Sequence, residues 1–204
     1  MEKVKDDNTE EQILDAAKTV FQSKGMDGAR MQEIADKAGI NKAMLHYYYR
    51  NKQLLFEAVF KNAFSLLAPQ LNAILNDDSS IEEKIKNFTS NYISFVIKHP
   101  YLPNFIIQEL NRNQDFVLKL KENKGFPNLD KFKKQVDTEV ENGIIKPISA
   151  EQLFINILAL NIFPFVAKPL VMALTNTNDK TYKNLMEERQ IEVSNFIIHS
   201  IKNT

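Results

Sequence analysis

The chain has 204 residues, no cysteine and equal numbers of acidic and basic side chains, so its formal net charge at pH 7 is zero. The absence of cysteine excludes a disulfide scaffold, a thiolate zinc site and cysteine catalysis. The glycine-rich patterns GxxxxGKS/T and GxGxxG of phosphate-binding enzymes are also missing. Because the charges of the whole chain cancel, any attraction to a nucleic acid has to come from a local segment.

The first quarter of the chain predicts helices separated by short turns. Apolar residues at helical spacing predict a helix over residues 10–24. Shorter helices are predicted over residues 31–38 and 42–48. Gly39 breaks the first of these short helices, and Asn41 is a good N-cap for the second.

A longer helix is predicted to start after Asn51 and to kink or break at Pro69. From residue 80 onward the predicted helices become longer and amphipathic. They cover residues 80–98, 103–112, 114–123, 128–141, 151–174 and 179–202. Pro164 and Pro169 should kink the helix that contains them.

Capping boxes support these assignments, because Thr9, Ser80 and Ser149 each precede a glutamate or glutamine by three residues. No alternating pattern typical of a strand appears, so the predicted fold class is all-α. We divide the chain into an N-terminal domain over residues 1–55 and a second helical domain over residues 56–204. One helix is shared by both domains.

The order helix, short helix, glycine turn, short helix is typical of a helix-turn-helix unit. Residues 1–36 contain five cations and nine acids, whereas residues 37–56 contain no acid. The cations of the second segment are Lys37, Lys42, Arg50 and Lys52. A polyanion would therefore be attracted to the segment that contains the second short helix.

The stretch from Met31 to Leu55, MQEIADKAGINKAMLHYYYRNKQLL, closely resembles the DNA-binding segment of TetR-family transcriptional regulators, and the match extends from Ile13 to Val59. The family pattern reads roughly IAxxAGVSxxxLYxYFxxKxxL. It appears here as Ile34-Ala35, Ala38-Gly39-Ile40-Asn41, Leu45-His46-Tyr47-Tyr48-Tyr49 and Lys52-x-Leu54-Leu55.

The sequence departs from this pattern at two places. Ala29-Arg30 stands where a threonine or serine usually caps the second helix, which predicts a weaker cap. His46 replaces the usual tyrosine, which changes a phosphate contact or makes it pH-sensitive.

The resemblance implies that residues 42–48 form a recognition helix for a double-stranded DNA operator. The candidate DNA-binding residues are Lys42, Ala43, Met44, His46, Tyr47, Tyr48 and Lys52. At the start of this helix, Lys42 is placed to reach a phosphate or a guanine edge. Ala43 or Met44 is suited to touch a thymine methyl group.

The tyrosines of this segment receive different roles. Tyr47 and Tyr48 combine a flat ring with a hydroxyl, which suits contacts with phosphate and sugar. Tyr49 matches the core phenylalanine of the family and is interpreted as structural. Lys52 begins the next helix, where the helix dipole already attracts a phosphate.

The second domain is rich in aromatic side chains that are suited to line an apolar cavity between helices, although simple core packing is the favoured interpretation for any single one of them. The candidate ligand-binding residues are Phe88, Tyr92, Phe95, Phe105, Asn156 and Asn161. The resemblance implies that a small-molecule effector, of unknown identity, binds in this domain. It also implies that the last two helices form a homodimer through a four-helix bundle.

The sequence thus predicts a homodimeric, ligand-responsive transcriptional regulator, a repressor released from its operator by a small apolar or amphipathic molecule. The alternative is a helical small-molecule carrier or enzyme with a vestigial helix-turn-helix. We expect no catalytic residues, no metal ligands and no cofactor. The N-terminus is too polar for a signal peptide, and polar residues interrupt the apolar run Leu153–Leu174. A cytoplasmic protein without a membrane span is therefore expected.

Overall fold

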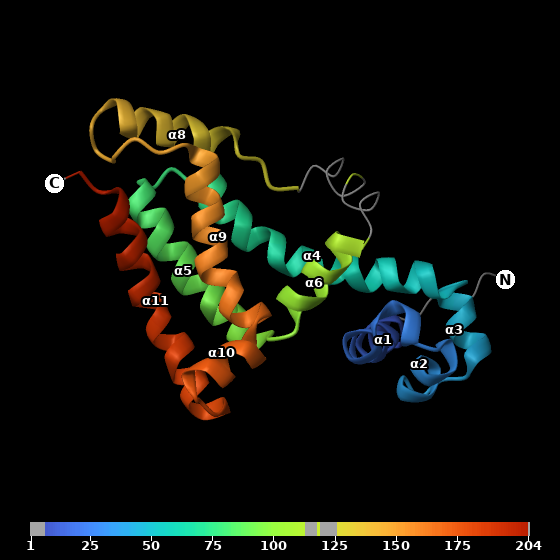
Figure 1. The fold of residues 1–204 in the computed structure, drawn as a ribbon. Helices are drawn as coiled ribbons and strands as arrows, with labels where there is room; N and C mark the ends of the chain where they lie inside the picture. Colours follow the sequence, from blue (N-terminus) through green and yellow to red (C-terminus); the bar gives the residue numbers. More distant parts are fainter. Residues whose placement is uncertain (1–6, 113–117, 119–125, 204) are drawn as a thin grey trace. The chain divides into compact units, whose positions relative to one another are not determined.

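The computed structural model describes residues 7–112, 118 and 126–203. In these ranges the chain folds into α-helices joined by short connections, so the predicted all-α class is confirmed (Figure 1). The predicted helix over 114–123 lies outside the described residues, apart from Leu118. The chain divides into two compact units, an N-terminal unit that ends at Ser65 and a C-terminal unit that starts at Leu66. This division falls inside a helix, later in the chain than the predicted boundary after residue 55.

The N-terminal unit contains three helices and the first part of a fourth. They are α1 (Asp7–Gly28), α2 (Met31–Lys37), α3 (Lys42–Tyr48) and α4 (Lys52–Asn76). The start of α1 precedes the predicted one, so Thr9 lies within the helix and the capping box predicted there is wrong. Near its end α1 is interrupted at Gly25, whose φ of 66° is accessible to glycine without strain.

Apolar side chains from all of these helices form the core of the N-terminal unit. Its fully buried members include Ile13, Ala17, Ile34, Ala35, Leu45 and Leu55. Phe21 of α1 meets Phe56 of α4 edge to face, with ring centroids 4.9 Å apart. Each large apolar side chain buried in this way contributes about 1.5–3 kcal/mol. The predicted apolar stripe of the first helix is therefore the surface that holds this unit together.

Helix α4 continues through Pro69, so of the kink or break predicted there the break is wrong. Proline deprives the carbonyl group four residues earlier of its helical donor. That residue is Ser65, which is exposed, as is Pro69 itself. Water can therefore hydrate the helix at this point, which lowers the cost of the missing hydrogen bond.

The C-terminal unit contains the rest of α4 and the helices that follow. They are α5 (Ile81–Lys98), α6 (Leu102–Arg112), α8 (Asp130–Glu141), α9 (Ala150–Val166), α10 (Lys168–Thr175) and α11 (Asp179–Ile201). α11 packs along α5, and α9 contacts both of them (Figure 1). The capping box at Ser80 is confirmed, and Ser149 caps α9 by accepting a hydrogen bond from the Gln152 N–H.

Buried charged groups fix the start of α5. Glu139 of α8 accepts a hydrogen bond from the Ile81 N–H at 3.0 Å, so a carboxylate from a distant helix satisfies one of the free donors at this helix end. One turn later the side chain of Lys84 is fully buried. Its ammonium lies 3.2 Å from the Asp77 carboxylate and donates to the Asp77 carbonyl oxygen at 2.9 Å. These contacts join α5 to α8 and to the turn that precedes α5.

The helix predicted over 151–174 is divided into α9 and α10, which are bent by 79° relative to each other. Pro164 lies inside α9 and Pro169 in the first turn of α10, so the predicted bend is confirmed. The Tyr182 hydroxyl of α11 donates to the Pro164 carbonyl oxygen at 2.8 Å. Burial raises the pKa of Tyr182 to about 12, which keeps this donor protonated at neutral pH.

Over the described ranges, no single helix has the length and apolarity required to cross a membrane. Taken together, α9 and α10 meet that requirement by length and composition, across their 79° bend.

Candidate nucleic-acid interface

A tight turn joins α2 to α3. α2 ends at Lys37, and Gly39 follows with a φ of 69°, the left-handed conformation that the sequence predicts for it. The Ile40 N–H donates to the Ala35 carbonyl oxygen at 3.0 Å, which closes the turn against the end of α2. The short helices are therefore held in a fixed relationship by backbone hydrogen bonds.

The N-terminal ends of α2 and α3 agree with the predicted caps. The Asn41 side chain accepts a hydrogen bond from the Met44 N–H at 2.8 Å, so α3 starts where it is expected. At the start of α2, Arg30 occupies the N-cap position and its side chain makes no capping hydrogen bond. The weaker cap predicted for α2 is thus confirmed.

α3 has a buried face and an exposed face. Leu45 is fully buried and Tyr48 is 7% exposed, and these side chains fix the helix to the core. The exposed face consists of Lys42, Ala43, Met44, His46 and Tyr47. All five are predicted from the sequence to bind DNA, and the fold brings them together on one short helix.

Tyr48 differs from the other tyrosine that is predicted to contact DNA. Tyr47 is 49% exposed, whereas the ring of Tyr48 is part of the core and meets the ring of Tyr47 edge to face. Tyr48 lies three residues after Leu45, so helical geometry places both on the buried face. The buried ring of Tyr48 can thus hold the exposed ring of Tyr47 in place through this contact.

Tyr49 lies in the core, as predicted. Its hydroxyl donates to the Glu10 carboxylate of α1 at 2.7 Å. Burial of the side chain is the main cause that raises the pKa of Tyr49, and the hydrogen bond to Glu10 raises it further. The phenol therefore stays protonated and connects the end of α3 to α1.

Residues 13–59 match the model of a protein family described as "Bacterial regulatory proteins, tetR family". This segment is a TetR-family helix-turn-helix domain. The curated relatives include the transcriptional repressor NicS of Pseudomonas putida, which is 25% identical over 103 residues, 50% of this chain and 49% of NicS. IcaR of Staphylococcus epidermidis, a negative regulator of the biofilm operon icaADBC, is 33% identical over 72 residues, 35% of this chain and 39% of IcaR. The chain spans about half, or less, of the length of these relatives.

Solved structures resemble the whole chain in fold. A TetR family transcription regulator from Marinobacter aquaeolei VT8 gives a TM-score of 0.65, with 16% identity and 97% of each chain covered. A TetR-family transcriptional regulator from Haemophilus influenzae gives a TM-score of 0.62 at 16% identity, covering 96% of this chain and 97% of its own. At this level of identity the similarity establishes a shared helical fold.

Inside the TetR-family domain, Lys52 has an internal role that the sequence did not predict. Its ammonium group donates to the Ala29 carbonyl oxygen at 3.1 Å and to the Asp27 carbonyl oxygen at 3.3 Å. The Ala29 carbonyl group belongs to the connection between α1 and α2, and the Asp27 carbonyl group belongs to the end of α1. Lys52 thus ties the start of α4 to that connection, and the phosphate contact predicted for it has to compete with these hydrogen bonds.

His46 is the residue at which the TetR-family domain departs from the family pattern on its exposed face. Its Nδ1 lies 3.1 Å from the carbonyl oxygen of Arg50. A carbonyl oxygen only accepts hydrogen bonds, so Nδ1 has to carry the proton. The other ring nitrogen, Nε2, is therefore the one without a proton when the ring is neutral.

The N-terminal unit contains further charged residues outside α3. Arg50 is exposed directly after α3, and it adds a positive charge to which the sequence assigned no individual role. Lys24 of α1 is paired with Glu33 of α2 at 2.7 Å. This exposed pair contributes no more than about 1 kcal/mol. The acid-free segment over residues 37–56 therefore remains the strongest local positive charge of the domain.

The candidate ligand-binding residues of the C-terminal unit occupy different environments. Phe88, Tyr92, Phe105 and Asn161 are buried, and Phe95 is half-buried. Phe88 stacks on Tyr92 with ring centroids 5.2 Å apart. The buried face of α9 carries Ile157 and Asn161. Asn156 lies on another face of this helix and is exposed, so it is separated from the buried candidates.

A pocket of about 330 Å³ opens between α5, α10 and α11. It is lined by Val96, Ile97, Pro100, Phe165, Lys168, Asp179, Tyr182, Lys183 and Met186. None of the predicted ligand-binding residues contributes to it. In the described parts of the chain, no group of three or more histidine or acidic side chains is arranged to hold a metal ion.

Proposed function

We propose that the chain is a transcriptional regulator that binds double-stranded operator DNA through α3. The observation that carries this proposal is the exposed face of α3, where Lys42, Ala43, Met44, His46 and Tyr47 share one short helix within an acid-free segment. A helix of this kind fits the major groove, and positive charge without nearby acids attracts the phosphates. The family membership of residues 13–59 supports the same role.

Each exposed side chain offers a contact of defined chemistry. Lys42 can donate to a phosphate or to the O6 and N7 atoms of guanine. Ala43 and Met44 present apolar surface to a thymine methyl group. Tyr47, held by the ring of Tyr48, presents a hydroxyl to the phosphate–sugar backbone. Contacts with bases give sequence selectivity, and contacts with phosphates fix the position of the helix.

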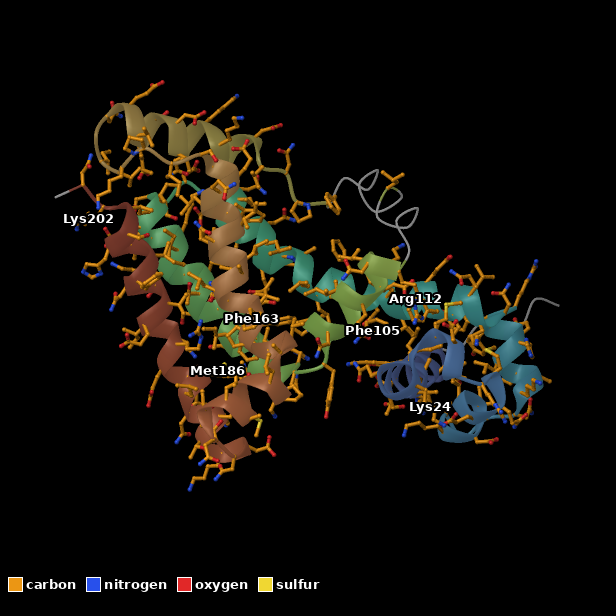
Figure 2. The ribbon with its side chains drawn as sticks, viewed as in Figure 1. Lys24, Phe105, Arg112, Phe163, Met186 and Lys202 are labelled. Carbon is orange, nitrogen blue, oxygen red and sulfur yellow. The ribbon has the colours of Figure 1, made fainter. Side chains whose placement is uncertain are left out.

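We further propose that the regulator is a homodimer that uses α9 and α11. Large apolar side chains remain exposed on these helices: Ile155 and Phe163 on α9, and Ile191 and Phe196 on α11. Phe163 is labelled in Figure 2. Exposed apolar surface of this kind is typical of protein–protein interfaces. A twofold dimer would place its recognition helices about 34 Å apart, one turn of DNA.

The direction of regulation that we propose is repression relieved by a small molecule. NicS is described as a repressor and IcaR as a negative regulator, which favours the same direction for this chain. A ligand releases DNA only if it binds the DNA-incompetent state more tightly than the DNA-bound state. The coupling free energy between two binding sites of this kind is typically about 1–3 kcal/mol. An operator-binding repressor acts where the chromosome lies, in the cytoplasm, and needs no catalytic group.

The test is selection of genomic DNA fragments on the purified full-length protein, followed by sequencing and by anisotropy titrations on the fragment found. We expect Lys42→Ala to weaken binding and to reduce the salt dependence by about one unit for each phosphate that the variant no longer neutralises. The matched control is Lys180→Ala, an exposed lysine on α11, which should bind as the unchanged protein does. Failure to enrich any fragment would contradict the proposal and favour a carrier or enzyme with a vestigial helix-turn-helix.

A further inference from the structure

The pocket of about 330 Å³ lies at the bend between α9 and α10, and residues of α5 and α11 complete its lining. Phe165, before the bend, and Lys168, after it, both line the pocket. Tyr182 of α11 lines it as well, and its hydroxyl is held by the Pro164 carbonyl oxygen. The bend therefore places residues from both of its sides around one pocket.

The buried part of the pocket lining is apolar. Val96, Phe165 and Met186 are no more than 8% exposed, and Met186 is labelled in Figure 2. The pocket volume falls within the range of about 300–1,000 Å³ that is typical of small-molecule sites. A water molecule takes up about 30 Å³ in the liquid, so the pocket has room for an apolar body of about ten non-hydrogen atoms.

The solvent-accessible part of the lining carries charged groups. Lys168 and Asp179 pair with each other at 2.7 Å, and the Lys168 ammonium lies 5.2 Å from the centre of the Tyr182 ring. Lys183 has a weaker partner, because its ammonium lies 3.7 Å from the Glu187 carboxylate and both side chains are at least half exposed. The lining thus contains two ammonium groups and one carboxylate, an excess of one positive charge.

We propose that this pocket binds a small amphipathic carboxylate, whose apolar body lies against Val96, Phe165 and Met186 and whose carboxylate group pairs with Lys183. The apolar body gains from leaving water. The carboxylate group stays at the accessible edge of the pocket, so it avoids the full cost of burying a charge. This inference deepens the proposed effector-responsive function, on which it rests, by assigning the effector to a site and a chemical class.

The charges of the lining disfavour the other classes of ligand. A cationic ligand would meet the ammonium groups of Lys168 and Lys183, whereas Asp179, the acid of the lining, is already paired. A neutral ligand of the same shape would gain the apolar contacts but no ion pair with Lys183. Because only an anion gains both, ligands of equal shape and different charge distinguish these classes.

The test uses matched probes on the full-length protein without DNA: 4-propylbenzoate, 4-propylbenzamide and 4-propylbenzylamine, which is a cation at neutral pH. Calorimetry should show the propylbenzoate binding about fivefold or more tightly than the amide and the amine. Comparable or tighter binding of the amide or the amine would overturn the proposal. Failure of the propylbenzoate to bind at millimolar concentration would also overturn it.

The apolar body is tested by shortening the probe. Unsubstituted benzoate lacks the three carbon atoms of the propyl group and should bind about tenfold more weakly than 4-propylbenzoate. Equal affinities would show that the protein recognises only the charge at its surface, which would refute the apolar part of the site.

Two variants with opposite expected effects place the carboxylate group. Lys183→Met removes its partner and should weaken propylbenzoate binding about fivefold. Asp179→Asn removes a like charge and frees Lys168, so it should tighten binding about twofold or more. Both positions are exposed, so both proteins should fold. Lys134→Met, at an exposed position on α8 outside the pocket lining, should have no effect, and unchanged affinity in both pocket variants would refute the assignment.

Operator binding separates this inference from the proposed function. The effector-responsive function requires that 4-propylbenzoate weakens the affinity for the operator fragment in anisotropy titrations, and that Lys183→Met requires more of the ligand for the same effect. A protein that binds the propylbenzoate through Lys183 but keeps its operator affinity would confirm the site and refute the effector-responsive function. A protein that binds the operator but not the propylbenzoate would refute this inference alone.

Discussion

Arg189 of α11 donates a hydrogen bond from Nη2 to the Leu160 carbonyl oxygen of α9 at 2.7 Å. Leu160 lies four residues before Pro164, so its carbonyl group is the one that this proline deprives of a helical donor. An arginine from the neighbouring helix replaces the missing N–H. Arg189 is half-buried, and this burial lowers the pKa of its guanidinium from the usual value.

Arg189→Met should lower the free energy of unfolding by about 1–3 kcal/mol, because it leaves the Leu160 carbonyl group without a donor. In a Pro164→Ala background the backbone N–H at position 164 can serve Leu160, so the same substitution should then cost much less. Urea unfolding of all four proteins gives the coupling. An equal loss of unfolding free energy in the wild-type and the Pro164→Ala backgrounds would show that Arg189 acts in some other way. Lys183→Met, at an exposed position on the same helix, serves as the control.

Lys52→Met tests whether this lysine holds the TetR-family domain together. The variant cannot form the hydrogen bonds to the Asp27 and Ala29 carbonyl groups, and we expect a decrease of about 1–2 kcal/mol in unfolding free energy. Lys61→Met, at an exposed position on the same helix, should change stability by less than about 0.5 kcal/mol. A Lys52→Met protein of unchanged stability with a weaker salt dependence of DNA binding would instead support a phosphate contact for this lysine.

His46 predicts that operator binding tightens as the pH falls. Nδ1 keeps its proton for the Arg50 carbonyl group, so the neutral ring offers only a bare Nε2, which cannot donate to a phosphate. Protonation adds a donor and a positive charge, worth about 1.5 kcal/mol or about tenfold per contact.

Anisotropy titrations between about pH 8 and pH 5.5, the range in which histidines gain a proton, measure this effect. His46→Tyr should flatten the profile, whereas His199→Gln on α11 should leave it unchanged. A profile that is equally steep in the His46→Tyr protein would assign the pH dependence to another group.

Phe196→Glu should dissociate the dimer that we propose without unfolding the protomer, because Phe196 is 65% exposed on α11. Ile197, the next residue, is 2% exposed, so a charge there should unfold the C-terminal unit instead. Light scattering and circular dichroism distinguish these outcomes. A wild-type protein that is monomeric at micromolar concentration would contradict the homodimer.

Local signals in the sequence predicted the position of α3, the helix that we propose to bind DNA. Gly39 and Asn41 fix the turn and the start of α3 through their own backbone and side-chain preferences, so no distant contact was required. The burial of Tyr48 could also have been found, since it follows Leu45 at helical spacing. The hydrogen bonds of Lys52 could not, because they depend on how α4 returns to the connection between α1 and α2.

The C-terminal unit shows the same limit. Asn161 lies four residues after Ile157 on the buried face of α9, whereas Asn156 lies on another face, so periodicity separates these candidates. Prolines indicated a bend between α9 and α10, but they indicated neither its size of 79° nor the hydrogen bond from the Tyr182 hydroxyl of α11 to the Pro164 carbonyl oxygen. The contact between Arg189 and Leu160 joins residues far apart in the chain, which no local pattern can reveal.

The shortness of α3 limits the information that one protomer can extract from a genome. A helix from Lys42 to Tyr48 is about 10 Å long, which matches about three base pairs of the groove. A given sequence of three base pairs recurs about once in 64 base pairs, and a pair of such sequences recurs about once in 4,000 base pairs. A genome offers about a million or more competing sites, so neither frequency is low enough to mark a single operator. If α3 binds DNA as we propose, the operator must carry further information outside the base pairs that α3 contacts, in the distance between the two half-sites and in the bendability of the DNA that separates them.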